Sequence, residues 1–446
     1  MKHYDESGFE RRVNRFLRTA EELGRHICQQ AIWHEDRCNW VGAVPRELPG
    51  AGVQVGATYQ ALGPDLYSGT SGVALYLAEL NSVTQESLLR RVALGAVRQA
   101  LSRMDSMAPS ARLGLFSGSI GVAFVAIRIA MLLGEPELLD KALPLLRRSA
   151  PESYDKREFD IMSGRAGAIA ALVVLNHILN DSFLLEFAIR LGDELLETAD
   201  HTDIGYSWAA SRGLRNQHNL TGFSHGAAGA AYALLELFQA TADSRYRDAA
   251  LLAFQYERHW FETSIGNWPD FREGRSATSR KRRTRSFATF WCHGAPGIAL
   301  SRLRAYEILN DQTCKAEATT ALKTTQGSIE AALDTLVGNF SMCHGLAGNA
   351  DVLINGAEIL RAESGEEAAL ALNVANFGIE RYSAARRAPW PCGTHAGETP
   401  NLMLGLAGIG HFYLRLYRPS IPSILLLRKD AWRRQNGPGK GAPEGH

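Results

Sequence analysis

The chain has 446 residues, and its 46% hydrophobic and 21% charged side chains are typical of a soluble globular protein with a large core. Its formal net charge of +1 argues against a general binder of nucleic acid or of membrane surfaces. The N-terminus lacks the apolar core of a signal peptide, and no apolar run approaches the roughly 18 residues of a membrane span. Six dispersed cysteines do not make a disulfide scaffold, so we expect a cytoplasmic protein whose reduced thiols can bind metal.

The two ends of the chain differ from its middle. Residues 9–33 have the periodicity of an amphipathic helix, and the Gly- and Pro-rich stretch 45–56 predicts a loop with short extended pieces. We expect residues 1–60 to form a lead-in packed on the main domain and residues 61–430 to form that domain. Residues 431–446 have the composition of a disordered tail.

An internal repeat runs through the main domain. Each copy reads as an aromatic or small residue, a second small residue and Gly-x-x-Gly, followed by an apolar run. The copies lie at residues 67–72, 116–121, 162–167, 224–229, 292–297, 343–348 and 403–408. Their spacing of 46 to 68 residues leaves room for two helices and their loops at about 1.5 Å rise per residue.

The segments inside and between the copies indicate the fold class. The runs after the glycines are apolar on nearly all sides, which predicts buried helices. Amphipathic helices with charged faces are expected between them, over residues 86–101, 182–198, 245–261 and 366–385. Alternation of β-branched residues is scarce. The sequence therefore predicts an all-α fold, an α/α barrel or toroid of seven inner and about seven outer helices.

The residues that can carry chemistry fall in two columns of the aligned repeat. The position before the first glycine is occupied by His225, His293 and His344 in copies four to six. The position before that is Cys292 in copy five and Cys343 in copy six. Because equivalent positions of a barrel lie at the same end of every inner helix, these side chains should meet at one mouth.

Cys292, Cys343 and His344 are the predicted ligands of a zinc ion. Two thiolates and one imidazole leave a fourth position open, as in catalytic rather than structural zinc sites. His293 is an alternative to His344, and Cys392 as a fourth ligand would close the site. Soft thiolates suit Zn²⁺, and an open position can bind and ionise a substrate thiol.

His225 is the predicted proton donor, and Asp160, four residues before Gly164, would orient or polarise a group beside it. The alternatives are a histidine and an aspartate that merely cap helices. The basic segment 272–285 is either a solvated loop or a contact for an anionic or peptide ligand. Three further cysteines are expected to be inert: Cys28, Cys38 and Cys314.

At these motifs the sequence resembles the lanthionine synthetase C-like (LanC-like) family of zinc-dependent cyclases. The matching pieces are residues 224–226, 291–294 and 343–345 within the seven-copy pattern. It is similar, more narrowly, to the C-terminal cyclase domain of class II lanthipeptide synthetases, the LanM enzymes. Supporting stretches are residues 62–67, 266–270, 404–410 and 422–427, and the resemblance covers roughly residues 10–430.

The resemblance implies a lanthionine synthetase, an enzyme that adds a peptide cysteine thiolate to dehydroalanine or dehydrobutyrine and so forms a thioether ring. Cys292, Cys343 and His344 would match the zinc ligands of the family, His225 its acid/base histidine and Asp160 its aspartate. His293, which we count with His225 and Asp160 among the catalytic residues, stands where some stand-alone cyclases have a tyrosine and where the LanM-like and eukaryotic LanC-like branches also have histidine. Those cyclases also place an arginine four residues before the first cysteine, where this chain has Ala288; the nearest arginine is Arg285.

A full class II synthetase also has a kinase-like dehydratase domain, longer than this whole chain. Only about 60 residues precede the first repeat, so we expect a dehydrated precursor peptide, leader plus core, as substrate and a separate dehydratase domain or protein as partner. The chain would otherwise be one half of a split synthetase or the isolated cyclase domain of a larger one. The alternatives are a LanC-like enzyme that adds glutathione to dehydroamino acids, and a non-catalytic LanC-like binding protein. An α/α-barrel glycosidase is discounted because it needs paired carboxylates where this chain has Cys and His.

Overall fold

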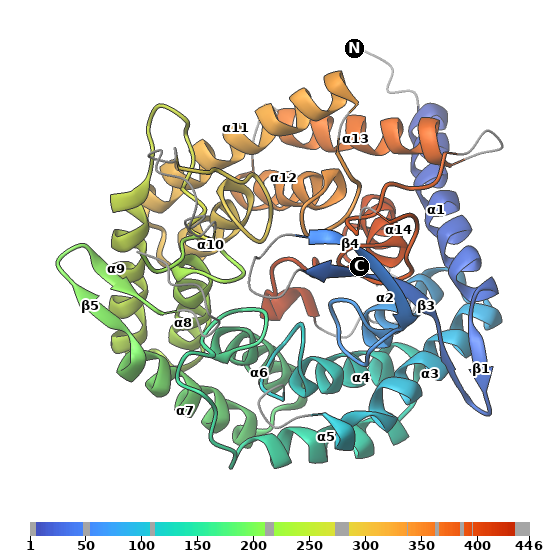
Figure 1. The fold of residues 1–446 in the computed structure, drawn as a ribbon, viewed down its shortest axis with the longest axis horizontal. Coiled ribbons are helices and arrows are strands. Elements are labelled where there is room, and N and C mark those ends of the chain that lie inside the picture. Colours follow the sequence, from blue (N-terminus) through green and yellow to red (C-terminus); the bar gives the residue numbers. More distant parts are fainter. Residues whose placement is uncertain are drawn as a thin grey trace, which may run out of the picture.

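The structure is a computed structural model that describes residues 6–47, 54–107, 112–209, 218–272, 285–336, 338–361, 365–383, 388–394 and 396–432. In this part of the chain, fourteen α-helices form an inner and an outer ring around one axis (Figure 1). The inner helices are α2 (Thr70–Thr84), α4 (Ser119–Leu133), α6 (Arg165–Leu179), α8 (Ala227–Thr241), α10 (Ala295–Leu309), α12 (Leu346–Leu360) and α14 (Leu406–Tyr417). The outer helices are α1 (Glu6–Gln29), α3 (Ser87–Ser102), α5 (Glu137–Ser149), α7 (Ser182–Thr198), α9 (Ser244–Trp260), α11 (Gln312–Thr335) and α13 (Glu366–Tyr382). The predicted α/α barrel is confirmed.

Each inner helix begins at one copy of the repeat, with the first glycine as its N-cap. The second glycine lies in the first turn, where a Cβ would clash with the backbone carbonyl six residues earlier. Gly121 thus contacts the Leu115 carbonyl, and Gly408 contacts the Leu402 carbonyl. The preceding loop can therefore fold back over the helix start. All seven loops gather at one end of the barrel, which we call the mouth.

The outer helices pack on the inner ones in sequential pairs, and α1 packs on α14 to complete the outer ring (Figure 1). The helices α7, α9 and α11 begin at aspartates whose carboxylates accept first-turn N–H groups, which stabilises their N-termini. The predicted segments 86–101, 182–198 and 245–261 agree with α3, α7 and α9 to within one residue. None of the described helices is both long and apolar enough to cross a lipid bilayer.

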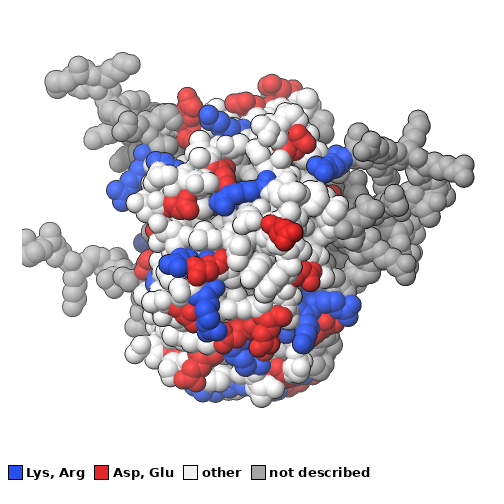
Figure 2. All heavy atoms as spheres, turned by 90° about the vertical axis from the view of Figure 1, so that its left-hand side faces the viewer, with Lys and Arg blue, Asp and Glu red and all other residues white. Residues whose placement is uncertain are grey.

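The outer surface carries mixed charge. Figure 2 shows the side of the barrel around α9, where basic and acidic side chains are interspersed. Ion pairs link neighbouring outer helices there, such as Arg258 of α9 with Glu317 of α11 and Arg245 of α9 with Asp193 of α7. This pattern accords with the formal net charge of +1.

Within the described ranges, three two-stranded antiparallel hairpins accompany the rings. They pair β1 (Ile32–His34) with β2 (Arg37–Asn39), β3 (Val41–Glu47) with β4 (Gln54–Ala61), and β5 (Asp200–Thr202) with β6 (Gly205–Ser207). The first helix begins before the predicted residue 9 and ends at Gln29 instead of Trp33, because Ile32 and Trp33 already pair with β2. The stretch 45–56 supplies the end of β3 and the start of β4, and its residues 48–53 lie outside the described residues.

Residues 421–427 enter the ring of inner helices and fill its axis; we call them the plug. The Trp291 indole N–H donates to the Leu425 carbonyl (3.0 Å), and the Tyr232 hydroxyl donates to the Leu427 carbonyl (2.6 Å). The single-turn 3₁₀ helices are η1 (Met104–Ser106) and, after the plug, η3 (Lys429–Trp432). Of the expected tail, residues 433–446 lie outside the described residues.

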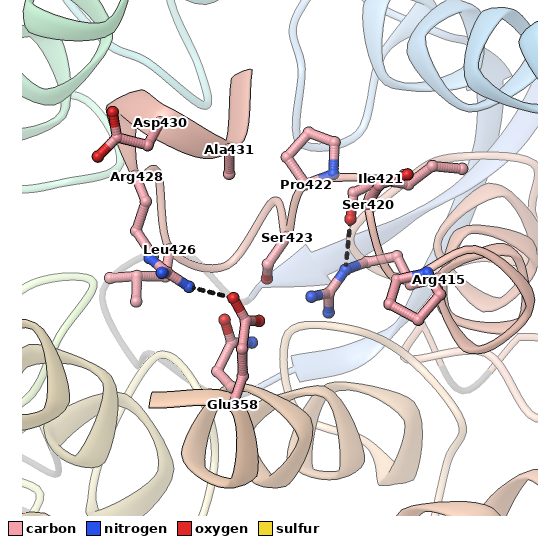
Figure 3. A pocket seen from close by; sticks show the side chains of 12 residues that line it. Glu358, Arg415, Ser420, Ile421, Pro422, Ser423, Leu426, Arg428, Asp430 and Ala431 are labelled. Atoms are coloured by element: carbon pink, nitrogen blue, oxygen red, sulfur yellow. Dashed lines mark hydrogen bonds and ion pairs between the residues drawn. The ribbon is translucent and has the colours of Figure 1, made fainter. Parts of the chain in front are cut away.

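At the end opposite the mouth, a cavity of about 300 Å³ lies between the plug and the C-terminal ends of α12 and α14 (Figure 3). We call this end the rear. Arg415, Arg428 and Glu358 line the cavity together with Ser423.

Candidate active site

Backbone hydrogen bonds join neighbouring copies of the repeat around the mouth. They run from Tyr67 N to Phe116 O, Phe116 N to Met162 O, Ile161 N to Ser224 O, Ser224 N to Cys292 O, Cys343 N to Met403 O and Met403 N to Tyr67 O, at 2.9–3.3 Å. Among the described residues, only the junction between copies five and six has no such bond. At that junction the N-cap Gly294 has φ +88°, whereas the other six N-cap glycines have φ between −104° and −136°. This interrupted junction is where the two cysteines of the repeat face each other.

The thiols of Cys292 and Cys343 are buried and hydrogen-bonded to each other, and neither cysteine is in a disulfide. The pKa of Cys292 is lowered because Cys343 donates to it and because the Arg272 charge is near, although burial opposes the shift. The pKa of Cys343 is raised well above its ordinary value by that same hydrogen bond and by burial, while the Tyr67 hydroxyl contacts its sulfur. The two thiols titrate as a pair in which Cys292 ionises first.

His344 follows Cys343, with its ring against Phe290 (5.7 Å between centroids). Its Nε2–H donates to the Gly393 carbonyl (3.1 Å). This bond assigns the hydrogen to Nε2 and leaves Nδ1 as the nitrogen with a lone pair, the arrangement found in metal-ligating histidines. Two thiols and such an imidazole form a donor set that fits zinc. Among the described residues no three His, Cys, Asp or Glu side chains converge closely enough to hold a metal ion, so this ligand set stays a prediction.

The remaining cysteines lie away from the thiol pair. Cys392 is buried and interacts with the backbone of Thr399, and burial raises its pKa to about 12. Burial likewise raises the pKa of Cys28 and Cys38 to about 12 and that of Cys314 to about 11. Buried thiols with raised pKa values are poor nucleophiles, which agrees with the inert role expected of the last three.

His225 and Asp160 form a hydrogen-bonded pair beside the thiols. The Nδ1–H of His225 donates to Asp160 Oδ2 at 2.7 Å, and the histidine side chain is 35% exposed. Burial lowers the pKa of His225, but the bond to Asp160 outweighs it and the pKa is raised. Burial likewise opposes the ionisation of Asp160, yet His225 and the bonds from Ser163 leave its pKa lowered. The N-cap of α8 is Gly226, and the hydrogen bond of the His225 ring runs to Asp160, away from the first turn of the helix.

Asp160 does not take the helix-capping role that was its alternative, because the N-cap of α6 is Gly164; its second carboxylate oxygen holds the loop before the helix instead. Its Oδ1 accepts from the backbone N–H of Ser163 (2.7 Å) and from the Ser163 hydroxyl (3.2 Å). Asp65 makes the same two bonds to Ser68, at 2.7 and 3.3 Å. Burial raises the pKa of Asp65. One carboxylate oxygen of Asp160 thus holds the loop, and the other holds His225.

His293 packs in the same site, its ring stacked on that of His225 at 5.5 Å between centroids. It is 1% exposed, and among the described residues neither ring nitrogen makes a hydrogen bond. The Thr221 carbonyl is near the ring, and Asp270 Oδ1 lies 3.9 Å from Nδ1. Burial and the charge of Arg272 hold the pKa of His293 well below its ordinary value, so the ring is neutral.

Three residues near the thiols were not named individually as site residues from the sequence, although Arg272 belongs to the basic segment 272–285. Tyr67 belongs to the repeat but was grouped with the ordinary copies. Asp270 and Arg272 lie between copies four and five, where the repeat gives no register. Residues 273–284 of the basic segment lie outside the described residues; of its described residues, Arg272 is near enough to interact with both thiols, and Arg285 lies over the Trp260 ring (5.3 Å).

The fold and the site together define an α/α barrel with a thiol–imidazole site at its mouth. The family model of the lanthionine synthetase C-like protein matches residues 60–426, so the chain belongs to that family. A solved structure of nisin cyclase aligns over 96% of this chain and 98% of its own, with a TM-score of 0.58 and 15% identity, which is a likeness of fold.

Two curated relatives are similar over most of this chain. A Lactococcus lactis subsp. lactis protein called lacticin 481/lactococcin biosynthesis protein LcnDR2 is 21% identical over 80% of the chain. This chain covers only 36% of that longer protein, which agrees with the resemblance to a class II synthetase domain. A Danio rerio protein called glutathione S-transferase LANCL1 is 21% identical over 79% of this chain and 82% of its own length.

Proposed function

We propose that this chain is a zinc-dependent lanthipeptide cyclase that forms lanthionine and methyllanthionine thioether rings in a dehydrated peptide. The observation that carries the proposal is the meeting of the Cys292–Cys343 thiol pair with the Asp160–His225 pair at one mouth. Thiol activation and proton donation are the two requirements of thiol addition to an activated double bond. Family membership supports the same reaction class.

Cys292, Cys343 and His344 are the residues that would hold zinc. A zinc ion there would supply the Lewis acidity that keeps a substrate cysteine thiol deprotonated at neutral pH. The hydrogen bond from His344 Nε2–H to the Gly393 carbonyl would fix the orientation of the imidazole ring.

The bond changes balance without a further reactant. The peptide thiolate sulfur forms a bond to Cβ of dehydroalanine or dehydrobutyrine, and the π electrons of the double bond move toward Cα and the neighbouring carbonyl. His225 gives a proton to Cα, and the proton released by the thiol restores the charge balance. The peptide thus gains a ring without a change in mass. Asp160 keeps Nδ1 of His225 protonated, so Nε2 points away from the carboxylate as the working nitrogen.

The proposed substrate implies an earlier step. Dehydroamino acids in peptides arise by loss of water from Ser or Thr, so a dehydratase in a separate protein or domain must act first. We propose that this site receives its dehydrated peptide from that activity, in a cytoplasmic setting where cysteines stay reduced.

A test of the function uses the zinc-loaded protein and a dehydrated peptide that contains one cysteine. We expect an unchanged peptide mass with loss of the free thiol, read as failure to react with an alkylating reagent. If the peptide binds but its thiol is fully retained, the protein is not a cyclase and the interpretation as a non-catalytic binding protein remains.

A second candidate is addition of a free thiol such as glutathione to a dehydroamino acid. The similarity to a protein named as a glutathione S-transferase favours it, and the same residues would serve. The two reactions separate by mass, since glutathione addition raises the product mass by one tripeptide and cyclisation does not.

A further inference from the structure

The loop that carries Cys292 is closed on itself. The Phe290 backbone N–H donates to the His293 carbonyl (3.0 Å), and Thr289 pairs with Gly294 in an isolated β-bridge. The closure places Gly294 at φ +88°, a positive-φ conformation that glycine adopts at little cost. Because Thr289 lies at the base of this closed loop, a bond to Thr289 also positions Cys292.

A side chain of α12 crosses the interrupted junction to reach that loop. The backbone bonds of the mouth described above hold Cys292 to copy four and Cys343 to copy seven, and so do not set the distance between the two cysteines. Asn349, in the first turn of α12, donates its Nδ2–H to the Thr289 carbonyl (3.0 Å). Since α12 begins three residues after Cys343, this bond ties the Cys292 loop to the helix beside the second thiol.

The repeat sets the position of Asn349 apart. Four residues after the first glycine, the other six copies have a fully buried apolar residue: Val73, Val122, Ala168, Ala230, Ile298 and Ile409. Asn349 is nearly as buried, at 6% exposed, and its Oδ1 makes no hydrogen bond among the described residues. An unpaired buried polar atom is unfavourable, so packing alone would favour an apolar residue here too. The bond to Thr289 is what the amide adds to this copy.

We propose that Asn349 is a positioning residue that sets the spacing of Cys292 and Cys343 for the metal. This rests on the zinc ligands of the proposed function. Because the connection runs through a side chain, the two loops are held together without the backbone contact of the other junctions, and the thiols face each other between them. Ligands held in place lose less freedom on binding, so a fixed spacing strengthens metal binding. An asparagine that serves only folding would instead change stability and leave zinc affinity as it is.

The test compares two buried asparagines of α12. Asn349→Leu keeps the branched shape and removes the amide donor. It should weaken zinc binding about 10- to 100-fold, the usual effect of losing an outer contact of a metal site. Asn355→Leu is the matched control, because Asn355 is 1% exposed and donates within its own helix to the Asp351 carbonyl (2.7 Å). This control should lower the melting temperature and keep the wild-type zinc affinity.

Competition of each full-length protein with a chromophoric chelator measures the zinc Kd, without any peptide substrate. Asn349→Ala, which has the residue of copies three and four, tests the same loss even if Asn349→Leu fails to fold. Co²⁺ in place of zinc provides a second measurement, and its thiolate absorption should be weaker in both variants at equal cobalt concentration.

Wild-type zinc affinity in a folded Asn349 variant would overturn the positioning role. A wild-type protein that binds zinc but forms no thioether would overturn the proposed function alone. A wild-type protein that binds no zinc would overturn both.

Discussion

The mouth and the rear of the barrel hold buried polar groups in opposite ways. At the mouth, His293 has no hydrogen bond within the described chain, and two unbridged thiols face each other. At the rear, Arg415 donates to the Ile421 carbonyl (3.0 Å; Figure 3). It also forms an ion pair with Asp351, to which Ser423 donates (2.6 Å). Internal pairing of this kind stabilises a fold, whereas incompletely paired groups are available to a ligand. The contrast assigns chemistry to one end and closure of the barrel to the other.

Cys343→Ala should have the largest effect, at the mouth. Loss of one thiolate should remove zinc and lower the rate of ring formation about 10³-fold or more, because the metal supplies several kcal/mol of the catalysis. Metal content of the purified protein and thioether formation are the measurements. Cys392→Ala is the control and should keep both. One equivalent of zinc in Cys343→Ala would refute the ligand assignment.

His225→Ala should keep zinc and lower kcat by about 10²- to 10⁴-fold, the usual contribution of a positioned proton donor. Steady-state kinetics on the dehydrated peptide measure this. His201→Ala, on the exposed β5 strand, should behave like the wild type. Full activity of His225→Ala would return His225 to a structural role.

The rear should respond in stability instead. Asp351→Asn leaves Arg415 buried without its carboxylate, and breaking a buried ion pair costs about 3–5 kcal/mol. Chemical denaturation should show this decrease in the free energy of unfolding. The folded fraction of Asp351→Asn should still bind zinc. If the variant instead kept wild-type stability and lost zinc, the separation between a metal-binding mouth and a stabilising rear would be wrong.

Asp160→Asn should shift a pH profile. Burial lowers the pKa of His225 and Asp160 raises it above the ordinary value. A proton donor works below its pKa, so kcat should fall as pH rises through that raised value. Without the carboxylate, burial remains and the fall should begin at lower pH.

Asp65→Asn is the matched control for Asp160→Asn, because Asp65 holds its own loop in the same way but binds no histidine. It should leave the alkaline limb of the kcat profile in place. Identical profiles for the two variants would show that Asp160 acts only on its loop.

Arg428→Gln should have the smallest effect. Arg428 pairs with Glu307 (2.9 Å) and with Glu358 (2.8 Å), which is 52% exposed. Partly exposed pairs contribute about 0.2–1 kcal/mol, so the melting temperature should move little. A loss as large as that of Asp351→Asn would mean that the whole rear acts as one network.

The repeat predicted the fold and most of the candidate site for one physical reason. Equivalent positions of a barrel lie at the same height, so a column in the alignment becomes a neighbourhood in space, as for Cys292 and Cys343. The contribution of Asp270 and Arg272 could not be placed, because a loop between copies carries no periodic signal. From the sequence, residues 422–427 of the plug were recognised only as a motif that supports the family resemblance. Their position inside the barrel could not be predicted, because an apolar segment can pack either around a barrel or within it.

The interrupted junction between copies five and six has a mechanical consequence. Among the described residues, backbone hydrogen bonds join neighbouring copies at six junctions, whereas copies five and six meet only through side chains. A force on the ring of loops would therefore strain this junction first. Binding that brings the two sulfurs closer would bring the N-terminal ends of α10 and α12 closer, and binding that separates the sulfurs would move these ends apart. A ligand that changes the distance between the two sulfurs would therefore act first on α10 and α12, the helices that begin beside Cys292 and Cys343.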